Sequence, residues 1–273
     1  MKTRTAKEPM SNGIIIRLKD KKWLENQRVA GKVAAEAIQL LKKEVENNTV
    51  KSMLELDKLA EAYIRDNNCL PTFLNYMGFP NSVCISINRQ LVHGICTDYK
   101  LQDGDLVSFD LGATYNGAIG DTAVTMIYGK PKSDRHVELV KATEEALTKA
   151  IESIQIGKRI GIIGQTIYKC AKEHGLSVVD KYGGHGLDTA EDGTGIPHTA
   201  PFVPNKSTEN EGVRIQPGMI LAIEPLFVIG SSNRAITSSD GWTVVCDDLC
   251  SHHEHTLYVH DDHVEVVTQI NGD

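Results

Sequence analysis

The 273-residue sequence lacks a long apolar run, and no stretch approaches the roughly 18 apolar residues that a membrane-spanning helix needs. Its N-terminus also lacks the apolar segment that a signal peptide carries after its first lysines. Positive charge is not in excess, because the formal net charge is -7. The chain therefore has no basic face for general nucleic-acid binding, and we expect neither membrane nor direct nucleic-acid contacts.

The sequence also lacks a disulfide framework and an internal linker. Its six cysteines are scattered through a chain long enough to bury a substantial core without disulfide bonds, which favours reduced thiols and a cytoplasmic protein. No Ser/Gly-rich segment divides the chain, and its 41% hydrophobic and 24% charged residues are ordinary for a globular protein. We predict a polar, flexible tail over residues 1–12 and a single domain over residues 13–273.

Both halves of the chain show the same order of elements. Apolar spacing predicts a helix pair over 20–47 and 52–66, and a second pair over about 133–156 and 163–174. Strands are predicted at 83–87, 178–179, 219–223, 242–245, 255–259 and 264–268. Two helices followed by antiparallel strands in each half favour a mixed α/β domain with two related halves.

The stretch 105–128 is predicted to be a β-hairpin. Apolar and polar residues alternate along it, and Asn116-Gly117 is the strongest two-residue turn signal for a hairpin. If these residues form the loop, Asp110 and Asp121 lie on one face as diagonal neighbours, on the order of 7 Å apart. Two such carboxylates in an apolar hairpin repel each other, so they either hold a proton, bind a cation or lie in solvent.

Four further motifs carry chemistry. His185 stands among glycines, His198 lies in a proline-flanked segment predicted to be a stiff loop, and Glu224 ends a fully apolar strand. Glu254 opens the last apolar strand. Taken singly, these residues are also compatible with a turn histidine, exposed glutamates and a solvated polar patch.

Taken together, these motifs predict a metal site. Asp110, Asp121, Glu224 and Glu254 supply oxygen, His185 supplies one nitrogen, and four carboxylates balance two divalent cations. Such an oxygen-rich set suits Mn, Fe(II), Co or Zn. Two metals about 4 Å apart would bind and deprotonate a bridging water and polarise a carbonyl, as hydrolysis requires.

The wording and spacing of several segments resemble type I methionine aminopeptidases, the bacterial form of the pita-bread metallopeptidases. The segments are SVCISIN, LVHGI, DGDLVSFDLGATYNGAIGDTA, YGGHG, HTAP, GMILAIEP, DGWTV and HEHT, and the likeness extends over about residues 14–270. The resemblance implies a curved antiparallel sheet, with two helix pairs on its outer face and metals on its concave side. It also implies a dimetal aminopeptidase that removes methionine from nascent chains whose second residue is small.

The resemblance further implies roles for individual residues. Asp110 would bind one metal through two oxygens, Asp121 and Glu254 would bridge both metals, and His185 and Glu224 would complete the second metal's ligands. Glu224 would also handle the proton of the attacking water. Two histidines and an apolar pocket would bind substrate: His198 at the scissile carbonyl and its oxyanion, His93 near the substrate amine and leaving group, and Tyr76, Phe79, Cys84 and Trp242 around the methionine side chain.

Some features depart from the family pattern. The connection between His185 and His198 is longer than is usual, and we expect its extra segment, 187–196, to be an exposed, mobile, acidic loop near the cleft. Such a loop would either select substrates with Lys or Arg beyond the cleaved bond or be a passive excursion. Pro197 stands where the family usually has an aromatic residue, and Phe73 where a small cysteine is common, which bears on the size of the pocket.

Other interpretations remain open. A different exopeptidase of the same fold, such as an X-Pro peptidase, is an alternative, although those usually carry an N-terminal domain. A metal-free pita-bread binding protein is a second alternative, which loss of ligands would mark. Cys246 and Cys250, with His252, His253 and His255, are a further candidate zinc site. We expect a monomer, with nascent polypeptide N-termini and the ribosome as candidate partners.

Overall fold

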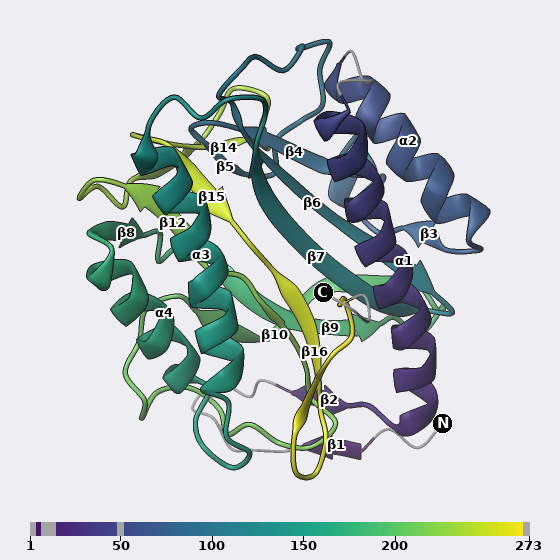
Figure 1. Cartoon of the computed structure of the whole chain (residues 1–273). Coiled ribbons are helices and arrows are strands. Elements are labelled where there is room, and N and C mark those ends of the chain that lie inside the picture. The colour runs from purple at the N-terminus through teal and green to yellow at the C-terminus, as the bar shows by residue number, and fades with distance from the viewer. Residues whose placement is uncertain (1–3, 7–14, 48–51, 270–273) are drawn as a thin grey trace.

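The computed structural model describes residues 4–6, 15–47 and 52–269. Its four α-helices are α1 (Lys21–Glu46), α2 (Met53–Asp66), α3 (Asp134–Glu152) and α4 (Gly161–Glu173). Figure 1 shows the pair α1–α2 and the pair α3–α4 on the same side of the strands. The predicted mixed α/β arrangement, with antiparallel strands covered by two helix pairs, is confirmed.

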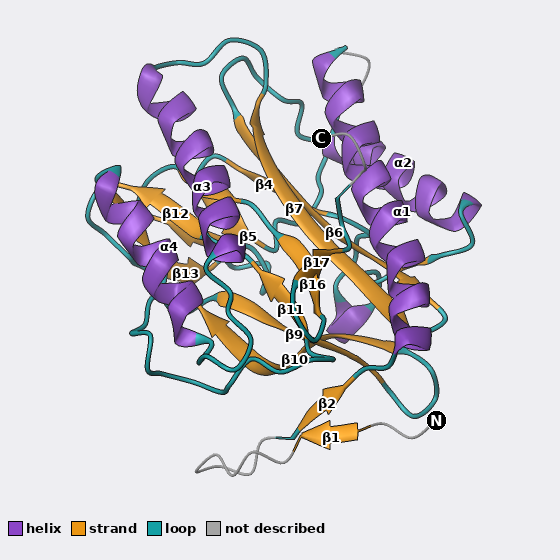
Figure 2. Cartoon of the chain, turned by 60° about the horizontal axis from the view of Figure 1, so that its bottom comes forward, coloured by secondary structure: helices purple, strands orange, loops and turns teal. Residues whose placement is uncertain are grey.

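The strands pair antiparallel throughout the described residues, and Figure 2 shows them in orange beneath the helices. In the first half of the chain the described strands and the short 3₁₀ helix are β1 (Arg4–Ala6), β2 (Ile16–Leu18), β3 (Leu70–Pro71), η1 (Tyr76–Gly78), β4 (Cys84–Ile87), β5 (Gln90–Val92), β6 (Leu106–Tyr115) and β7 (Ala118–Ile127). In the second half they are β8 (Leu176–Val178), β9 (Gly183–Thr189), β10 (Gly195–Pro204), β11 (Ile220–Ile223), β12 (Leu226–Ile229), β13 (Ala235–Thr237), β14 (Val244–Cys246), β15 (Cys250–His252), β16 (His255–Val259) and β17 (Val264–Val266).

Asp20 and Ser52 cap the first turns of α1 and α2. The Asp20 carboxylate accepts a hydrogen bond from the Trp23 backbone N–H at 2.9 Å, and the Ser52 hydroxyl accepts one from the Glu55 backbone N–H. Each bond satisfies a backbone donor that the first turn of a helix leaves unpaired. The apolar faces of both helix pairs then cover separate core clusters, one under α1–α2 and one under α3–α4.

The predicted hairpin 105–128 is confirmed in its register. β6 and β7 are joined at Asn116-Gly117, Asp110 pairs with Ala123, and Gly112 pairs with Asp121. α1 packs closely over β7 because Gly120 has no side chain, and a Cβ there would lie 2.3 Å from the Gly31 Cα. The hairpin is therefore held against the helix layer by backbone contact that a side chain at Gly120 would prevent.

An isolated bridge joins the two halves of the chain beside the hairpin. The Glu254 N–H donates to the Ala123 carbonyl at 2.9 Å, and the Ala123 N–H donates back to the Glu254 carbonyl at 3.3 Å. Thr256 reinforces this contact, since its hydroxyl donates to the Asp121 carbonyl at 2.7 Å and accepts from the Asp121 N–H at 2.9 Å. The bridge places the carboxylates of the hairpin beside the carboxylate that opens β16.

The prediction of a stiff loop around His198 was wrong. The segment belongs to the strand β10, which pairs with β9, the strand that carries His185. β10 is the edge strand of a five-stranded sheet, the position where missing proline N–H groups cost no ladder bonds. Gly184 and Gly186 let β9 approach its neighbours, because a Cβ at either would lie within 2.2 Å of a backbone oxygen.

The prediction of an exposed acidic loop over 187–196 was also wrong. Leu187 is buried in the core, and Asp188, which is 8% exposed, binds Arg17 at 3.0 Å and the buried Lys19. The Thr189 hydroxyl donates to the Gly117 carbonyl at 2.6 Å. The insertion thus extends the β9–β10 hairpin along β2 and the β6–β7 turn, and only its tip is exposed.

Near the N-terminus, Arg4–Ala6 forms β1 and pairs with β2 (Figure 2), whereas the rest of the predicted 1–12 tail lies outside the described residues. In the described part of the chain, no helix combines the length and apolarity that crossing a bilayer requires.

Candidate metal centre

One cavity of about 320 Å³ collects every residue to which the family resemblance gives a role in metal or substrate binding. The five candidate ligands come from β6, β7, β9, the end of β11 and the start of β16. The cavity is lined by these five residues, Asp110, Asp121, His185, Glu224 and Glu254, and by Tyr76, Phe79, Cys84, His93, His198 and Trp242. Strands that lie far apart in the sequence therefore converge on a single site.

The candidate ligands are buried and close together. Potential ligand atoms of Asp121, His185 and Glu254 all lie within 4.8 Å of one another. The His185 Nε2 atom is 3.5 Å from Glu224 Oε1 and 3.8 Å from Glu254 Oε1. Asp110 joins this group from the neighbouring strand and is 8% exposed. The predicted set of four carboxylates and one imidazole thus faces one space.

This group of carboxylates is electrostatically incomplete without a cation. Burial raises the pKa of Asp121 to about 7, and burial together with Asp121 raises the pKa of Glu224 to about 8. Burial and the neighbouring acids hold the pKa values of Asp110 and Glu254 well above their ordinary range. Burial also lowers the pKa of His185 to about 3, which keeps its imidazole neutral and able to coordinate a metal.

Unpartnered atoms provide the test of whether a metal fits. Asp110 Oδ1, Asp121 Oδ1 and Glu254 Oε1 are buried and have no hydrogen-bond partner. A buried carboxylate oxygen without a donor is costly unless it binds a cation or a proton. The oxygen-rich donor set with one imidazole fits Mn, Fe(II), Co or Zn, so the residues present suit divalent metal binding.

The glycines on either side of His185 position its ring. Side chains alternate along β9, so Gly184 and Gly186 face away from the carboxylates while His185 faces them. The close approaches that these glycines allow bring β9 against Ala222 of β11 and Ala200 of β10. The glycine-rich sequence around His185 is therefore a requirement of sheet packing, not a turn.

His198 lies where β10 departs from regular pairing, between Ile196 and Thr199. Such irregularities redirect side chains, and the His198 ring lies at 4.5 Å from the His185 ring, centroid to centroid. The His198 residue is exposed at the cavity, and partial desolvation of its ring by the surrounding protein lowers the pKa of the imidazole. His93 has a left-handed backbone, φ 58°, and burial followed by the nearby His198 lowers its pKa to about 4. Both imidazoles are therefore neutral near pH 7.

An apolar pocket adjoins the carboxylates. Phe73, Phe79 and Cys84 form a buried cluster against which Trp242 packs, and the Phe79 and Trp242 rings meet edge to face at 5.2 Å. Tyr76 lies on the other side, 5.8 Å from His198 between ring centroids. Phe73, which departs from the family pattern, lies in the wall of this pocket.

His252 is a neighbour of the carboxylates that the sequence analysis did not assign to them. Its Nε2 atom is 3.5 Å from Glu224 Oε2 and 3.6 Å from Glu254 Oε2, and neither ring nitrogen has a hydrogen-bond partner. Burial lowers its pKa to about 3. The two-residue spacing from Glu254 was the available signal, because alternate residues of extended chain share a face.

The candidate zinc site at the other cysteines has no support among the described residues. The Cys246 and Cys250 thiols hydrogen-bond to each other. None of His252, His253 and His255 joins them in a group of adjacent potential ligands within the ranges that the structure describes.

The insertion does not reach the cavity. No residue of 187–196 lines it, whereas Lys181, Tyr182, Met77 and Phe202 do. The acids of the insertion are therefore not placed to contact a substrate in the cavity.

Comparisons with known proteins agree on one family. Residues 25–261 match the model of metallopeptidase family M24. The methionine aminopeptidase of Mycoplasma capricolum is 38% identical over 93% of this chain and 99% of its own length. Methionine aminopeptidase 1 of Bacillus subtilis is also 38% identical, over 89% of this chain and 95% of its own. The crystal structure of methionine aminopeptidase from Rickettsia prowazekii superimposes with a TM-score of 0.84 at 32% identity, over 93% of this chain and all of that one.

Proposed function

The chain belongs to metallopeptidase family M24, and from that premise we propose that it removes the N-terminal methionine from proteins whose second residue is small. The observation that carries this proposal is the convergence of four buried carboxylates and His185 beside an apolar pocket in one cavity. The curated relatives that cover nearly the whole chain bear the name methionine aminopeptidase, which supports the same substrate.

The proposed ligands are Asp110, Asp121, His185, Glu224 and Glu254, with two divalent cations among them. Bound there, the cations would lower the pKa of water and polarise the scissile carbonyl. Asp121 and Glu254 lie on the two halves of the chain that the Ala123–Glu254 bridge joins, which suits them to contact both ions. This arrangement supports residues 13–273 acting as one catalytic domain.

The remaining residues of the cavity would bind the substrate. The Phe79 and Trp242 rings and the Cys84 side chain would hold the methionine side chain, since thioether sulfur contacts aromatic edges favourably. His198 would donate a hydrogen bond from its ring to the carbonyl oxygen and stabilise the charge that develops there. His93 would contact the substrate amine and the leaving group.

Glu224 is the proposed proton acceptor. One Glu224 oxygen faces His185 and the other faces His252, so the carboxylate is fixed between two neutral imidazoles. A carboxylate held there can accept a proton from water and pass it to the leaving amine. In the metal-free chain burial raises the pKa of Glu224 to about 8, and bound cations would lower it.

We further propose that the protein acts in the cytoplasm as a monomer, on nascent chains and in contact with the ribosome. All six cysteines are unpaired and buried, which suits a reducing compartment.

The test compares hydrolysis of Met-Ala-Ser, Ala-Ala-Ser and Ala-Pro-Ser by chelator-treated protein, with and without added Mn²⁺ or Co²⁺. We expect metal-dependent release of methionine from the first peptide alone. Cleavage of Ala-Pro-Ser in its place would show an X-Pro peptidase, and binding without cleavage of any peptide would show a non-catalytic binding protein.

A further inference from the structure

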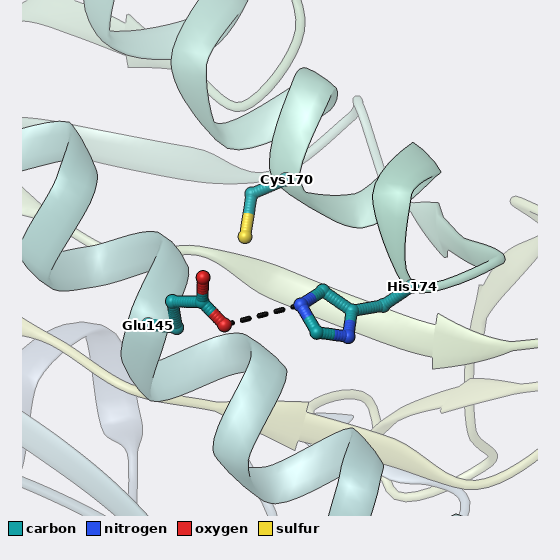
Figure 3. A group of neighbouring side chains, drawn as sticks. All are labelled: Glu145, Cys170 and His174. Atoms are coloured by element: carbon teal, nitrogen blue, oxygen red, sulfur yellow. Dashed lines mark hydrogen bonds and ion pairs between the residues drawn. The ribbon is translucent and has the colours of Figure 1, made fainter.

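A second group of potential metal ligands lies on the outer helices and not in the cavity (Figure 3). Glu145 comes from α3, whereas Cys170 and His174 come from the end of α4, and one ligand atom of each lies within 4.8 Å of the others. Figure 3 shows the Glu145 carboxylate beside the His174 ring, with the Cys170 sulfur directed toward both. None of the three lines the cavity, so this group is independent of the proposed catalytic centre.

The backbone holds these side chains on one surface. Cys170 and His174 are four residues apart, the spacing that puts two helical side chains on the same face. Arg135 of α3 fixes the end of α4, because its guanidinium donates to the His174 carbonyl at 3.0 Å and to the Gly175 carbonyl at 2.8 Å. The His174 ring is therefore held against α3 before any ligand arrives.

The two nitrogens of His174 face different carboxylates. Nε2 lies 3.1 Å from Glu145 Oε2, and Nδ1 lies 3.7 Å from Glu138 Oε1. In metal sites the second ring nitrogen of a histidine ligand commonly faces a carboxylate that fixes the tautomer. Glu138 is in the position to do so if Nε2 binds a metal.

An ion pair between the helices accounts for Glu145 and His174, and the Cys170 thiol donates a weak hydrogen bond to the Ala142 carbonyl at 3.8 Å. Lys149 already binds the other oxygen of Glu145, Oε1, at 2.6 Å and leaves Oε2 directed at His174. Cys170 is 1% exposed, yet its sulfur lies within reach of both groups, while the His174 and Glu145 side chains are 28% and 42% exposed. An ion can therefore enter from solvent and find a buried sulfur at the inner side of the group.

We propose that Glu145 Oε2, Cys170 Sγ and His174 Nε2 bind one Zn²⁺ ion that joins α4 to α3. Thiolate, imidazole and carboxylate are the three ligand types of zinc, whereas Mg²⁺ and Ca²⁺ take oxygen ligands. Ligand atoms around tetrahedral zinc lie roughly 3.3–3.6 Å apart, given the usual metal–ligand distances, so small side-chain rotations close the site. Water completes the coordination on the exposed side.

Zinc binding at this site must release the thiol proton. Burial raises the pKa of Cys170 to about 11, so the metal competes with a proton that is held firmly at neutral pH. Affinity for the metal should therefore rise with pH, since the thiol proton leaves when the ion binds.

The test titrates Co²⁺ into metal-free protein and follows the near-ultraviolet absorption of cobalt–thiolate bonds. The five candidate ligands of the cavity include no thiol, so this absorption separates the two sites. We expect it in the unaltered chain and in Cys69→Ser, a matched change of a buried cysteine in the core under α1–α2, and we expect Zn²⁺ to abolish it. Absence of the absorption in the unaltered chain, or an equal signal in Cys170→Ser, would overturn the proposal.

Substitution of the exposed ligands keeps the test valid if Cys170→Ser misfolds. His174→Gln and Glu145→Gln should weaken the thiolate-linked Co²⁺ binding at least tenfold, and Glu138→Gln should weaken it roughly tenfold. Unchanged binding in His174→Gln would refute the assignment. Metal-dependent hydrolysis of Met-Ala-Ser should persist in all three variants, so failure of this proposal and failure of the proposed catalytic function are distinguishable.

Discussion

The metal-free protein should become less stable to unfolding as the pH rises from 7.0 to 8.5. In the metal-free chain, Glu224 has a pKa of about 8, and those of Asp110 and Glu254 are also raised by burial. Each carboxyl group holds its proton more tightly in the folded chain than in the unfolded chain, where the pKa is about 4. The folded state therefore loses stability as the pH rises toward the folded-state pKa.

The size of the effect follows from the pKa values. Between pH 7.0 and 8.5, a carboxyl group with a folded-state pKa of about 8 costs about 1.3 kcal/mol, and one with a much higher pKa costs about 2 kcal/mol. Because these carboxyl groups interact and do not titrate independently, their losses do not simply add, and we expect a total loss on the order of 2–4 kcal/mol. The buried histidines oppose this trend only below their ordinary pKa of about 6.5, which is why the interval starts at pH 7.0.

Urea unfolding of chelator-treated protein at pH 7.0 and 8.5, followed by circular dichroism, measures the difference. Glu224→Gln removes one of the titrating groups and should flatten the dependence. Saturating Mn²⁺ should abolish or reverse it, because the cation takes the place of the protons. A metal-free chain that is equally stable or more stable at pH 8.5 would refute the electrostatic account of the site.

Three substitutions test separate parts of the structure. Glu254→Gln should abolish metal-restored hydrolysis of Met-Ala-Ser while circular dichroism shows a retained fold, and near-normal turnover would remove Glu254 from the ligands. His198→Ala should lower kcat by on the order of a hundredfold, the cost of losing one oxyanion donor, with metal content unchanged by elemental analysis; loss of metal would instead make His198 a ligand. Asp188→Asn should destabilise the fold by about 3–5 kcal/mol in urea unfolding, because Lys19 loses its buried partner, and should leave kcat/KM within about twofold. A stable Asp188→Asn variant with altered peptide preference would show that the 187–196 insertion contacts the substrate, against this prediction.

Local sequence signals were sufficient for the parts of the fold that depend on neighbouring residues. The Asn116-Gly117 turn sets the register of β6 and β7, and that register alone brings Asp110 and Asp121 to one face. The caps Asp20 and Ser52 likewise mark the first turns of α1 and α2. Each of these signals acts over a few residues, so no tertiary information was needed.

The β9–β10 hairpin could not be predicted in this way, because its residues are chosen by contacts with distant strands. Gly184 and Gly186 discourage a strand in isolation, but here they leave room for the backbone of Ala222 and Ala200. Asp188 and its neighbours read as an exposed loop, yet Arg17 and Lys19, about 170 residues earlier, neutralise Asp188. Composition could not reveal either partner.

The constellation of the site lies between these cases. The sequence supplied each candidate ligand, while His252 escaped because a histidine two residues before Glu254 is also compatible with a solvated strand. The structure adds it through two distances, 3.5 Å to Glu224 and 3.6 Å to Glu254. With His185, it places two imidazoles beside the glutamates.

The most direct test of the central claim is anomalous diffraction from crystals soaked with Mn²⁺, combined with Met-Ala-Ser hydrolysis by the same preparation. The account predicts two manganese peaks inside the cavity, ligated by Asp110, Asp121, His185, Glu224 and Glu254, and hydrolysis that appears only with the metal. Peaks that avoid these five residues, or full hydrolysis by the chelator-treated protein, would contradict it.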